Sequence, residues 1–191
     1  MKHALAILPA LLACAPPPAM ANEDHEPMAR ALVAEALYGD LHRSMVLETI
    51  SAQNETPIDT SAASILELER QWSRDRLEGG GTLLSSVDQS ALSTYLRTLK
   101  AESDGLYTEI LVTDALGFLV GQSDVATDYY QGDERKYLMT YPVGPGTVFV
   151  DLVEYDASVQ RIQSQVSFTI VDPDNGESIG VATVGIDGDR L

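Results

Sequence analysis

The chain has 191 residues, which suits one domain and is short for two. Its 45% hydrophobic and 21% charged residues can build a core, which excludes disorder and collagen-like repeats as descriptions of the whole chain. Asp and Glu number 29 against 12 Lys and Arg, and the formal net charge of -17 excludes a general nucleic-acid binder, because binding to phosphate needs clustered basic side chains.

Residues 1–21 predict an export signal peptide. Lys2 supplies a positive charge, and residues 4–14 form an apolar run that is too short to span a bilayer. Residues 19–21 form a small-x-small signal peptidase site, which would leave a mature chain that begins at Asn22. No later apolar stretch approaches the ~18 residues of a membrane span, so we expect a periplasmic protein without a transmembrane segment.

A lipoprotein signal is the alternative. Leu11, Leu12 and Ala13 before Cys14 resemble a lipobox, in which Cys14 becomes the lipidated first residue and residues 15–21 form a Pro-rich tether. Because the apolar run is early for a lipobox, we favour the soluble form. Cys14 is also the only cysteine, which excludes an intrachain disulfide and a zinc or iron–sulfur site built from several cysteines.

Residues 22–105 are predicted to be mainly helical. Apolar residues recur every four or five positions over residues 28–53, which indicates one long helix. Pro57 breaks this pattern because proline lacks an amide hydrogen, and a second helix begins near Ser61. Three consecutive glycines, residues 79–81, end the second helix.

A third helix is predicted from a capping box and an apolar stripe. Ser86 and Gln89 are three positions apart and have the residue types that cap the first turn of a helix. Gly105 stops this helix. The stripe consists of Leu92, Tyr95, Leu96 and Leu99.

After the third helix the hydrophobic period changes to two, which predicts strands. Residues 110–113 and 118–120 flank residues 114–117, whose composition favours a hairpin turn. Residues 121–134 are polar, acidic and aromatic, which indicates a loop. A short helix is predicted at residues 134–140.

Three further strands are predicted at residues 147–155, 163–171 and 178–186. Helices followed by an antiparallel meander of about five strands predict an α+β domain, in which a long N-terminal helix and further helices pack on the sheet. This single domain would span residues 22–191, with the sheet and a pocket loop in residues 106–191.

Four segments of the second half form an ordered set: TEILVTDALGFLVGQSD at residues 108–124, DYYQGDERKY at 128–137, VFVDLVEYD at 148–156 and IGVATVGID at 179–187. In this order they resemble the extracytoplasmic PAS-like sensor domains of the single-Cache (PDC) type. The predicted helix at residues 28–53 fits that family's N-terminal helix. The resemblance implies a small-molecule-binding domain outside the cytoplasm, with the ligand held over the sheet by the loop between the second and third strands.

Asp151 lies between apolar neighbours on its predicted strand, since Phe149, Asp151 and Val153 share one face. A carboxylate there costs free energy unless it is solvated or paired, and an ammonium or amide group of a ligand would pair it. The alternative is a face that meets water, where Asp151 is simply solvated.

Tyrosines are concentrated in the preceding loop and short helix. Tyrosine combines rigid apolar area with a hydrogen-bonding tip, which suits it to enclose a ligand. The alternative is a loop that packs its own aromatic rings onto the sheet. The residues concerned are Tyr129, Tyr130, Tyr137 and Tyr141.

One spacing also resembles the amino-acid-binding members of the wider Cache superfamily. Those proteins carry a Tyr, an Arg five positions later and an aromatic residue two beyond that, followed by an aromatic-x-Asp on the next strand. The resemblance implies that Arg135 clamps a ligand carboxylate and that Asp151 holds an ammonium group. The similar residues are Tyr130, Arg135, Tyr137, Phe149 and Asp151.

Leu138 departs from this spacing, because those proteins have a second aromatic residue there. The alternative is that Arg135 is a solvated helix residue that pairs with Asp133 or Glu134. The acidic residues of the region favour a cationic or zwitterionic ligand. They are Asp124, Asp128, Asp133 and Asp151.

We therefore expect a non-enzymatic sensor domain that binds a small polar or amine-bearing solute. We expect no output domain in this chain, so a membrane receptor or kinase would be its partner, and the N-terminal helix would dock onto that partner or pair two copies. Only His25 and His42 follow the predicted signal peptide, and a packed or surface helix position explains His42 better than a catalytic or metal site. We expect no cofactor, metal or catalytic residue. The alternatives are an interaction module without a ligand and a hydrolase that uses carboxylates alone.

Overall fold

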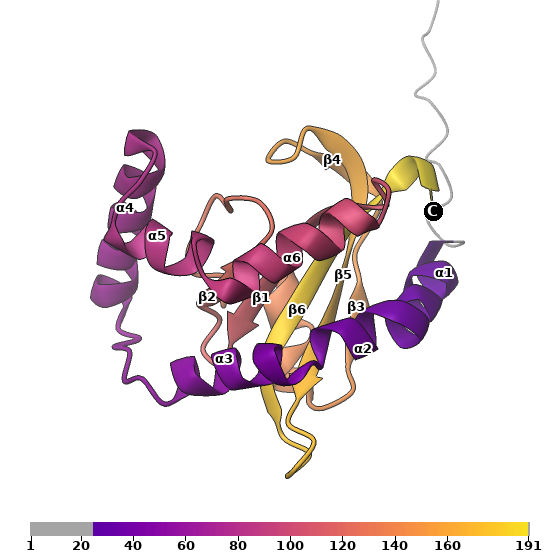
Figure 1. Ribbon diagram of the computed structural model, residues 1–191, viewed down its shortest axis with the longest axis horizontal. Helices are drawn as coiled ribbons and strands as arrows, with labels where there is room; N and C mark the ends of the chain where they lie inside the picture. Colours follow the sequence, from indigo (N-terminus) through magenta and orange to yellow (C-terminus); the bar gives the residue numbers. More distant parts are fainter. Residues whose placement is uncertain (1–24, 191) are drawn as a thin grey trace, which may run out of the picture.

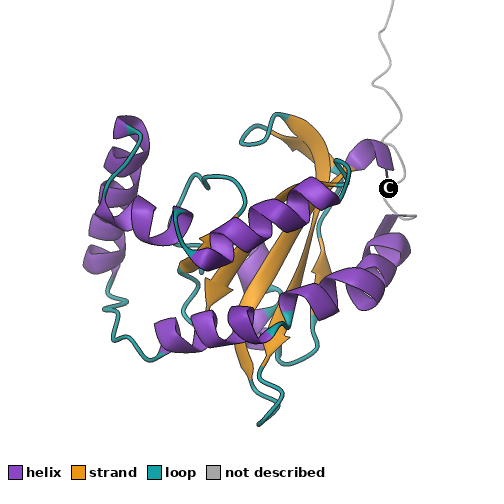
Figure 2. Ribbon diagram, viewed as in Figure 1, coloured by secondary structure: helices purple, strands orange, loops and turns teal. Residues whose placement is uncertain are grey.

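The computed structural model describes residues 25–190, and the predicted signal peptide and Cys14 lie outside this part of the chain. Helices and an antiparallel sheet make up the described residues, as Figures 1 and 2 show. The α+β class predicted from the sequence is confirmed.

The N-terminal arm is helical but interrupted. The predicted helix over residues 28–53 is divided at His42 and Arg43, which lie outside helical geometry. Arg43 has an extended backbone with ψ of 148°, and its guanidinium forms an ion pair with Asp40 at 3.0 Å. The arm consists of α1 (His25–Leu32), the π-helical turn η1 (Val33–Leu37), α2 (Tyr38–Leu41) and α3 (Ser44–Asn54).

Hydrogen bonds of His42 explain the interruption. Its ring stacks on Tyr38 with centroids 3.7 Å apart, and Nδ1 lies 2.7 Å from the Tyr38 carbonyl oxygen. Nε2 accepts a hydrogen bond from the Val171 amide at 3.2 Å. Because an amide can only donate, Nε2 carries no hydrogen and Nδ1 donates to Tyr38. The neutral ring therefore ties the end of α2 to the end of β5 (Arg161–Val171).

Three helices of different length follow the arm: α4 (Ala62–Glu78), α5 (Thr82–Asp88) and α6 (Ala91–Glu102). The predicted limits of the second helix are confirmed, since Ser61 caps α4 and Gly79 ends it with φ of 70°. No helix within residues 25–190 is long and apolar enough to cross a membrane.

The predicted capping box at Ser86 and Gln89 is wrong. Ser86 lies inside α5, and Gln89 follows the last residue of that helix. Ser90 caps α6 instead, because its extended backbone, with ψ of 156°, lets the hydroxyl accept a hydrogen bond from the Ser93 amide at 3.0 Å.

The sheet has the strand order β2-β1-β6-β5-β3, β4 also pairs with β5, and every pair is antiparallel. The predicted hairpin is confirmed, because Asp114 accepts hydrogen bonds from the amides of Leu116 and Phe118 in the turn. The predicted short helix at residues 134–140 is present as α7 (Arg135–Leu138), followed by the 3-10 turn η2 (Tyr141–Val143). The other strands are β1 (Tyr107–Asp114), β2 (Leu119–Gln122), β3 (Val148–Val150), β4 (Glu154–Asp156) and β6 (Ser178–Asp187).

The strand predicted at residues 147–155 is divided into β3 and β4. The amide of Asp151 still donates to the carbonyl of Gln165 at 2.8 Å, but the next amide, that of Leu152, donates to the Asp151 carboxylate at 2.9 Å. This local hydrogen bond takes the place of a bond to the neighbouring strand, so the chain leaves the sheet after Asp151. The division yields six strands where about five were expected.

The two faces of the sheet are covered differently. On one face Ile110, Phe168 and Val184 are fully buried under the arm and α6, which Figure 1 shows lying across the strands. On the other face a smaller core joins Leu111 of β1 to Trp72 of α4. The rest of this second face is polar.

The neutral state of His42 predicts a pH dependence of stability. Burial lowers its pKa below the ordinary value of about 6.5, and the hydrogen bond to the Tyr38 carbonyl opposes this only in part. The neutral His42 ring stabilises the folded protein fully above pH ~6.5, and this stabilisation is lost as the pH falls through the lowered pKa of the folded state. His42→Phe keeps the stacking but does not titrate, so urea unfolding at pH 7 and pH 5 should show a smaller loss in the variant. Parallel losses in both proteins would contradict this assignment.

Candidate functional site

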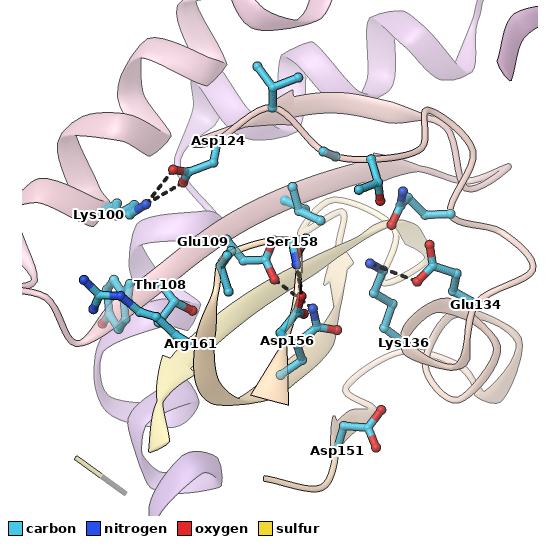
Figure 3. A pocket seen from close by; sticks show the side chains of 18 of the residues that line it. Lys100, Thr108, Glu109, Asp124, Glu134, Lys136, Asp151, Asp156, Ser158 and Arg161 are labelled. Carbon is cyan, nitrogen blue, oxygen red and sulfur yellow. Dashed lines mark hydrogen bonds and ion pairs between the residues drawn. The ribbon is translucent and has the colours of Figure 1, made fainter. Parts of the chain in front are cut away.

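A pocket of about 960 Å³ lies over the polar part of the second face, and Figure 3 shows it from close by. One wall comes from the end of α6 and the start of β1. A second wall is the loop that follows β2, together with α7. Asp151, the β4 hairpin and β5 complete the lining. These segments are far apart in the sequence, so only the folded domain forms the pocket.

Two carboxylates share an amide donor on the floor of the pocket. Glu109 accepts hydrogen bonds from Nε2 of Gln163 at 2.9 Å and of Gln165 at 2.8 Å. Nε2 of Gln163 also donates to Asp156 at 2.8 Å. Thr108 donates to the Oε1 of Gln163, which fixes the orientation of that amide. Figure 3 shows Glu109 and Asp156 near each other in the centre of the pocket.

Asp156 remains ionised at neutral pH. Burial acts to raise its pKa, but hydrogen bonds from Ser158 and Gln163 outweigh burial and lower the pKa below the ordinary value. The Ser158 hydroxyl and amide donate to Oδ1 of Asp156 at 2.6 and 2.8 Å.

Within residues 25–190, no group of three or more His, Cys, Asp or Glu side chains is arranged to hold a metal ion.

Every cationic side chain that lines the pocket already has an acidic partner. The pairs are Lys100 with Asp124 at 2.6 Å, Arg135 with Asp151 at 3.0 Å, Lys136 with Glu134 at 3.1 Å and Arg161 with Asp187 at 3.3 Å.

Carboxylates outnumber these cations, since seven line the pocket against four Lys and Arg. The excess negative charge lies in a partly enclosed space, where it attracts a cation more strongly than it would in open water. Four lining carboxylates form no ion pair within residues 25–190: Glu109, Asp128, Glu154 and Asp156.

The structure brings Arg135, Phe149 and Asp151 together. The Arg135 guanidinium pairs with Asp151 and lies 5.4 Å from the centre of the Phe149 ring. The side chain of Arg135 is 65% exposed, whereas that of Asp151 is only 19% exposed. Arg135 therefore does not form the alternative pair with Glu134, which binds Lys136.

Hydrogen bonds from two other elements fix the backbone of Asp151. Its carbonyl oxygen accepts from the Ser164 hydroxyl at 2.7 Å and from Nε2 of His25 at 3.0 Å. The Asp151 amide donates to the carbonyl oxygen of Gln165. The carboxylate thus projects from a backbone that β5 and α1 hold in place.

The predicted tyrosines lie in different places. Tyr129 is buried in the second core, where its ring lies 5.4 Å from both Trp72 and Phe118. Burial raises the pKa of Tyr129 to about 12. Tyr137 and Tyr141 stack at 5.3 Å, and burial raises the pKa of each hydroxyl.

The hydroxyls of this stacked pair bind protein groups. Tyr137 donates to the Ala115 carbonyl at 2.7 Å, and Tyr141 donates to the Ser178 carbonyl at 3.2 Å. Tyr130 lines a separate hollow of about 700 Å³ beside α4. From the predicted set, the main pocket is lined by Asp124, Asp128, Arg135 and Asp151, and its lining does not include Tyr129, Tyr130, Tyr137, Tyr141 or Phe149.

Side chains of α4 hold the loop that forms the second wall. Trp72 donates to the Ala126 carbonyl at 3.0 Å, and Arg76 donates to the Thr127 carbonyl at 2.7 Å. Glu69 accepts a hydrogen bond from the Tyr130 amide, and burial raises the pKa of this carboxyl. The position of the wall therefore depends on α4.

Sequence reasoning missed Glu109, Asp156 and Gln163. A signal was present in β5, where Gln163, Gln165 and Ser167 alternate with residues of the other face and thus predict a polar face. On β1, Glu109 shares a face with Leu111 by the same rule. That these residues meet depends on the pairing of β1 and β5 with β6, which alternation alone does not specify.

No protein-family model and no curated protein matches the chain. The Escherichia coli DcuS sensor domain is similar in structure, with 18% identity, 75% of this chain and 94% of that domain covered, and a TM-score of 0.38. The sensory domain of the Campylobacter jejuni chemoreceptor Tlp3 is 12% identical to this chain. The match covers 86% of this chain and 66% of the Tlp3 domain, with a TM-score of 0.42.

The ligand-binding domain of the Pseudomonas fluorescens chemoreceptor CtaA, solved with L-serine, is 12% identical to this chain. The match covers 87% of this chain and 62% of the CtaA domain, with a TM-score of 0.34. This chain thus spans less than two thirds of the length of either chemoreceptor domain. The DcuS and Tlp3 structures are sensor domains, and the CtaA structure is a ligand-binding domain.

The approach of Gly117 to the pocket loop predicts an unequal effect of two alanine substitutions. Gly117 has φ of 89°, and a Cβ there would lie 2.5 Å from the Cα of Gly132. Gly176 has φ of 77° but no atom within 4 Å of such a Cβ. Gly176→Ala should cost only the ~1–2 kcal/mol of a left-handed backbone, whereas Gly117→Ala should cost more because the loop must move. Chemical denaturation measures both losses, and equal losses would contradict the constraint.

Proposed function

We propose that this protein is an extracytoplasmic, non-enzymatic sensor domain that binds a small polar or amine-bearing solute and passes the signal to a membrane partner. The unmatched carboxylates of the pocket carry this proposal. Seven carboxylates face four cationic side chains, and each of those four already has an acidic partner. A ligand that supplies positive charge would restore the balance.

Asp151 and Arg135 would hold the polar end of such a ligand. In the protein alone the two side chains pair with each other. An amino acid would insert between them, with its ammonium group on Asp151 and its carboxylate on Arg135. Each charge keeps a partner in this exchange, and an ion pair with one side largely in water contributes only ~0–1 kcal/mol, so its loss costs little.

The α1 helix offers a path for the signal. It contacts the strand that leads to Asp151, since Arg30 donates to the Val148 carbonyl at 2.9 Å and His25 donates to the Asp151 carbonyl. A ligand that moves Asp151 would therefore act on these two contacts. The helical arm would carry the change to a membrane receptor or kinase, or to a second copy of the chain.

Asp151→Asn tests whether Asp151 binds the ammonium group of the ligand. A thermal-shift screen of amino acids, amines and carboxylates should find amine-bearing binders, and a binder at 100 times its Kd should add ~2.7 kcal/mol of stability. Asp151→Asn should weaken binding at least about tenfold, or ~1.4 kcal/mol, because the ammonium loses its charged partner.

Asp88→Asn is the control. Asp88 also pairs with an arginine, Arg97 at 3.2 Å, and neither of the two residues lines the pocket. The control should bind as the unaltered protein does. A screen without any amine-bearing binder, or equal affinities in the two variants, would refute the proposal.

A further inference from the structure

We propose that the pocket takes a ligand with two separated cationic groups, and that Glu109 and Asp156 receive the second of them. This inference rests on the proposed function, because it names the class of ligand that the same pocket binds. Neither residue belongs to the Arg135 and Asp151 pair, which would hold the first polar group. The candidate ligands are diamines, polyamines and amino acids with a basic side chain.

Glu109 and Asp156 form a carboxylate pair that only neutral groups hold. Glu109 is 6% exposed, and its carboxylate receives hydrogen bonds from Gln163 and Gln165. Asp156 receives hydrogen bonds from Ser158 and Gln163. Amide and hydroxyl donors form hydrogen bonds with both carboxylates but bring no positive charge to either. Within the described residues neither has a cationic partner, so an ammonium or guanidinium group would supply what the pair lacks.

The orientation of Gln163 suits this role. Its Oε1 accepts a hydrogen bond from Thr108, so its Nε2 must face the carboxylates. One amide group therefore holds Glu109 and Asp156 next to each other from two strands, β1 and β4. The two like charges repel each other, and a cation between them would remove that repulsion.

Gln131 provides an independent sign of a ligand rich in N–H groups. It also lines the pocket, and its side chain is buried, with 2% exposure of the residue. Nε2 donates to the Asp128 carbonyl at 2.7 Å, which leaves Oε1 as the free acceptor. This oxygen has no hydrogen-bond partner among the described residues. A buried acceptor without a partner is costly, and a donor on a ligand would satisfy it.

The two proposed ends of the ligand lie on different strands. The Asp151 amide donates to the Gln165 carbonyl of β5, Gln165 is in register with Gly185 of β6, and Gly185 is in register with Glu109 of β1. At ~4.8 Å per strand spacing, the backbones of Asp151 and Glu109 are ~14 Å apart, and the two side chains reach over the pocket from these positions. A short chain of methylene groups with a cation at each end suits two carboxylate sites that are separated in this way.

Calorimetric titration with paired probes tests the inference. The pairs are 1,5-diaminopentane against n-pentylamine and L-lysine against L-norleucine, which differ chiefly in one ammonium group. The unaltered protein should bind the dicationic member of at least one pair about tenfold more tightly or better. Glu109→Gln and Asp156→Asn should each abolish this preference, because the dication loses far more affinity than the monocation.

Asp88→Asn again serves as control and should keep the preference. Equal affinity for both members of each pair in the unaltered protein, or an undiminished preference in Asp156→Asn, would overturn the inference. The proposed function would survive that result if a monoamine or neutral amino acid binds and Asp151→Asn weakens it. If Glu109→Gln does not fold, Asp156→Asn decides, because Asp156 is less buried and lies at the end of a three-residue strand. If no amine binds, both proposals fail.

Discussion

Burial of the central strands on both faces is the constraint from which the rest of the architecture follows. Every residue of β1 is buried: the helical arm and α6 cover one face, and α4, α5 and the loop after β2 pack on the other. Any polar side chain there needs a hydrogen-bond partner. The second face changes from apolar to polar between Leu111 and Glu109, and the pocket lies where polar contacts replace apolar packing.

The polar floor satisfies hydrogen bonds without balancing charge, and these are separate physical requirements. Gln163 and Gln165 both donate to Oε1 of Glu109 but bring no positive charge to it. At the rim, Arg135 does balance Asp151, in a contact that one exposed partner can leave at little cost. The pocket thus combines a fixed anionic floor with an adjustable pair, which suits selection of a ligand by its charge distribution.

The fold was largely predictable because its signals are local. The turn at residues 114–117 and the caps of α4 depend on neighbouring residue types, and both were predicted. Ser90 was missed because Ser86 and Gln89 offered a competing cap four residues earlier. The break after β3 could not be predicted, since it depends on the Asp151 carboxylate binding the amide of Leu152.

The candidate site was predictable only in part. Arg135, Phe149 and Asp151 were singled out by a spacing on two nearby segments, and the structure brings them together. Glu109 and Asp156 escaped notice because they meet through Gln163, and that meeting requires the correct order of four strands. Pairings between residues distant in sequence leave little trace in a single sequence.

The place of β6 in the sheet has a consequence for how the protein folds. β6 lies between β1 and β5, so the strand that begins the sheet pairs with the strand that ends it. Contacts of such long sequence separation form slowly, because a large loop must close before they stabilise anything. The floor of the pocket therefore cannot assemble until the chain is available through Asp187. A chain synthesised only as far as β5 therefore lacks the floor of the pocket, which is complete only once β6 has paired with β1 and β5.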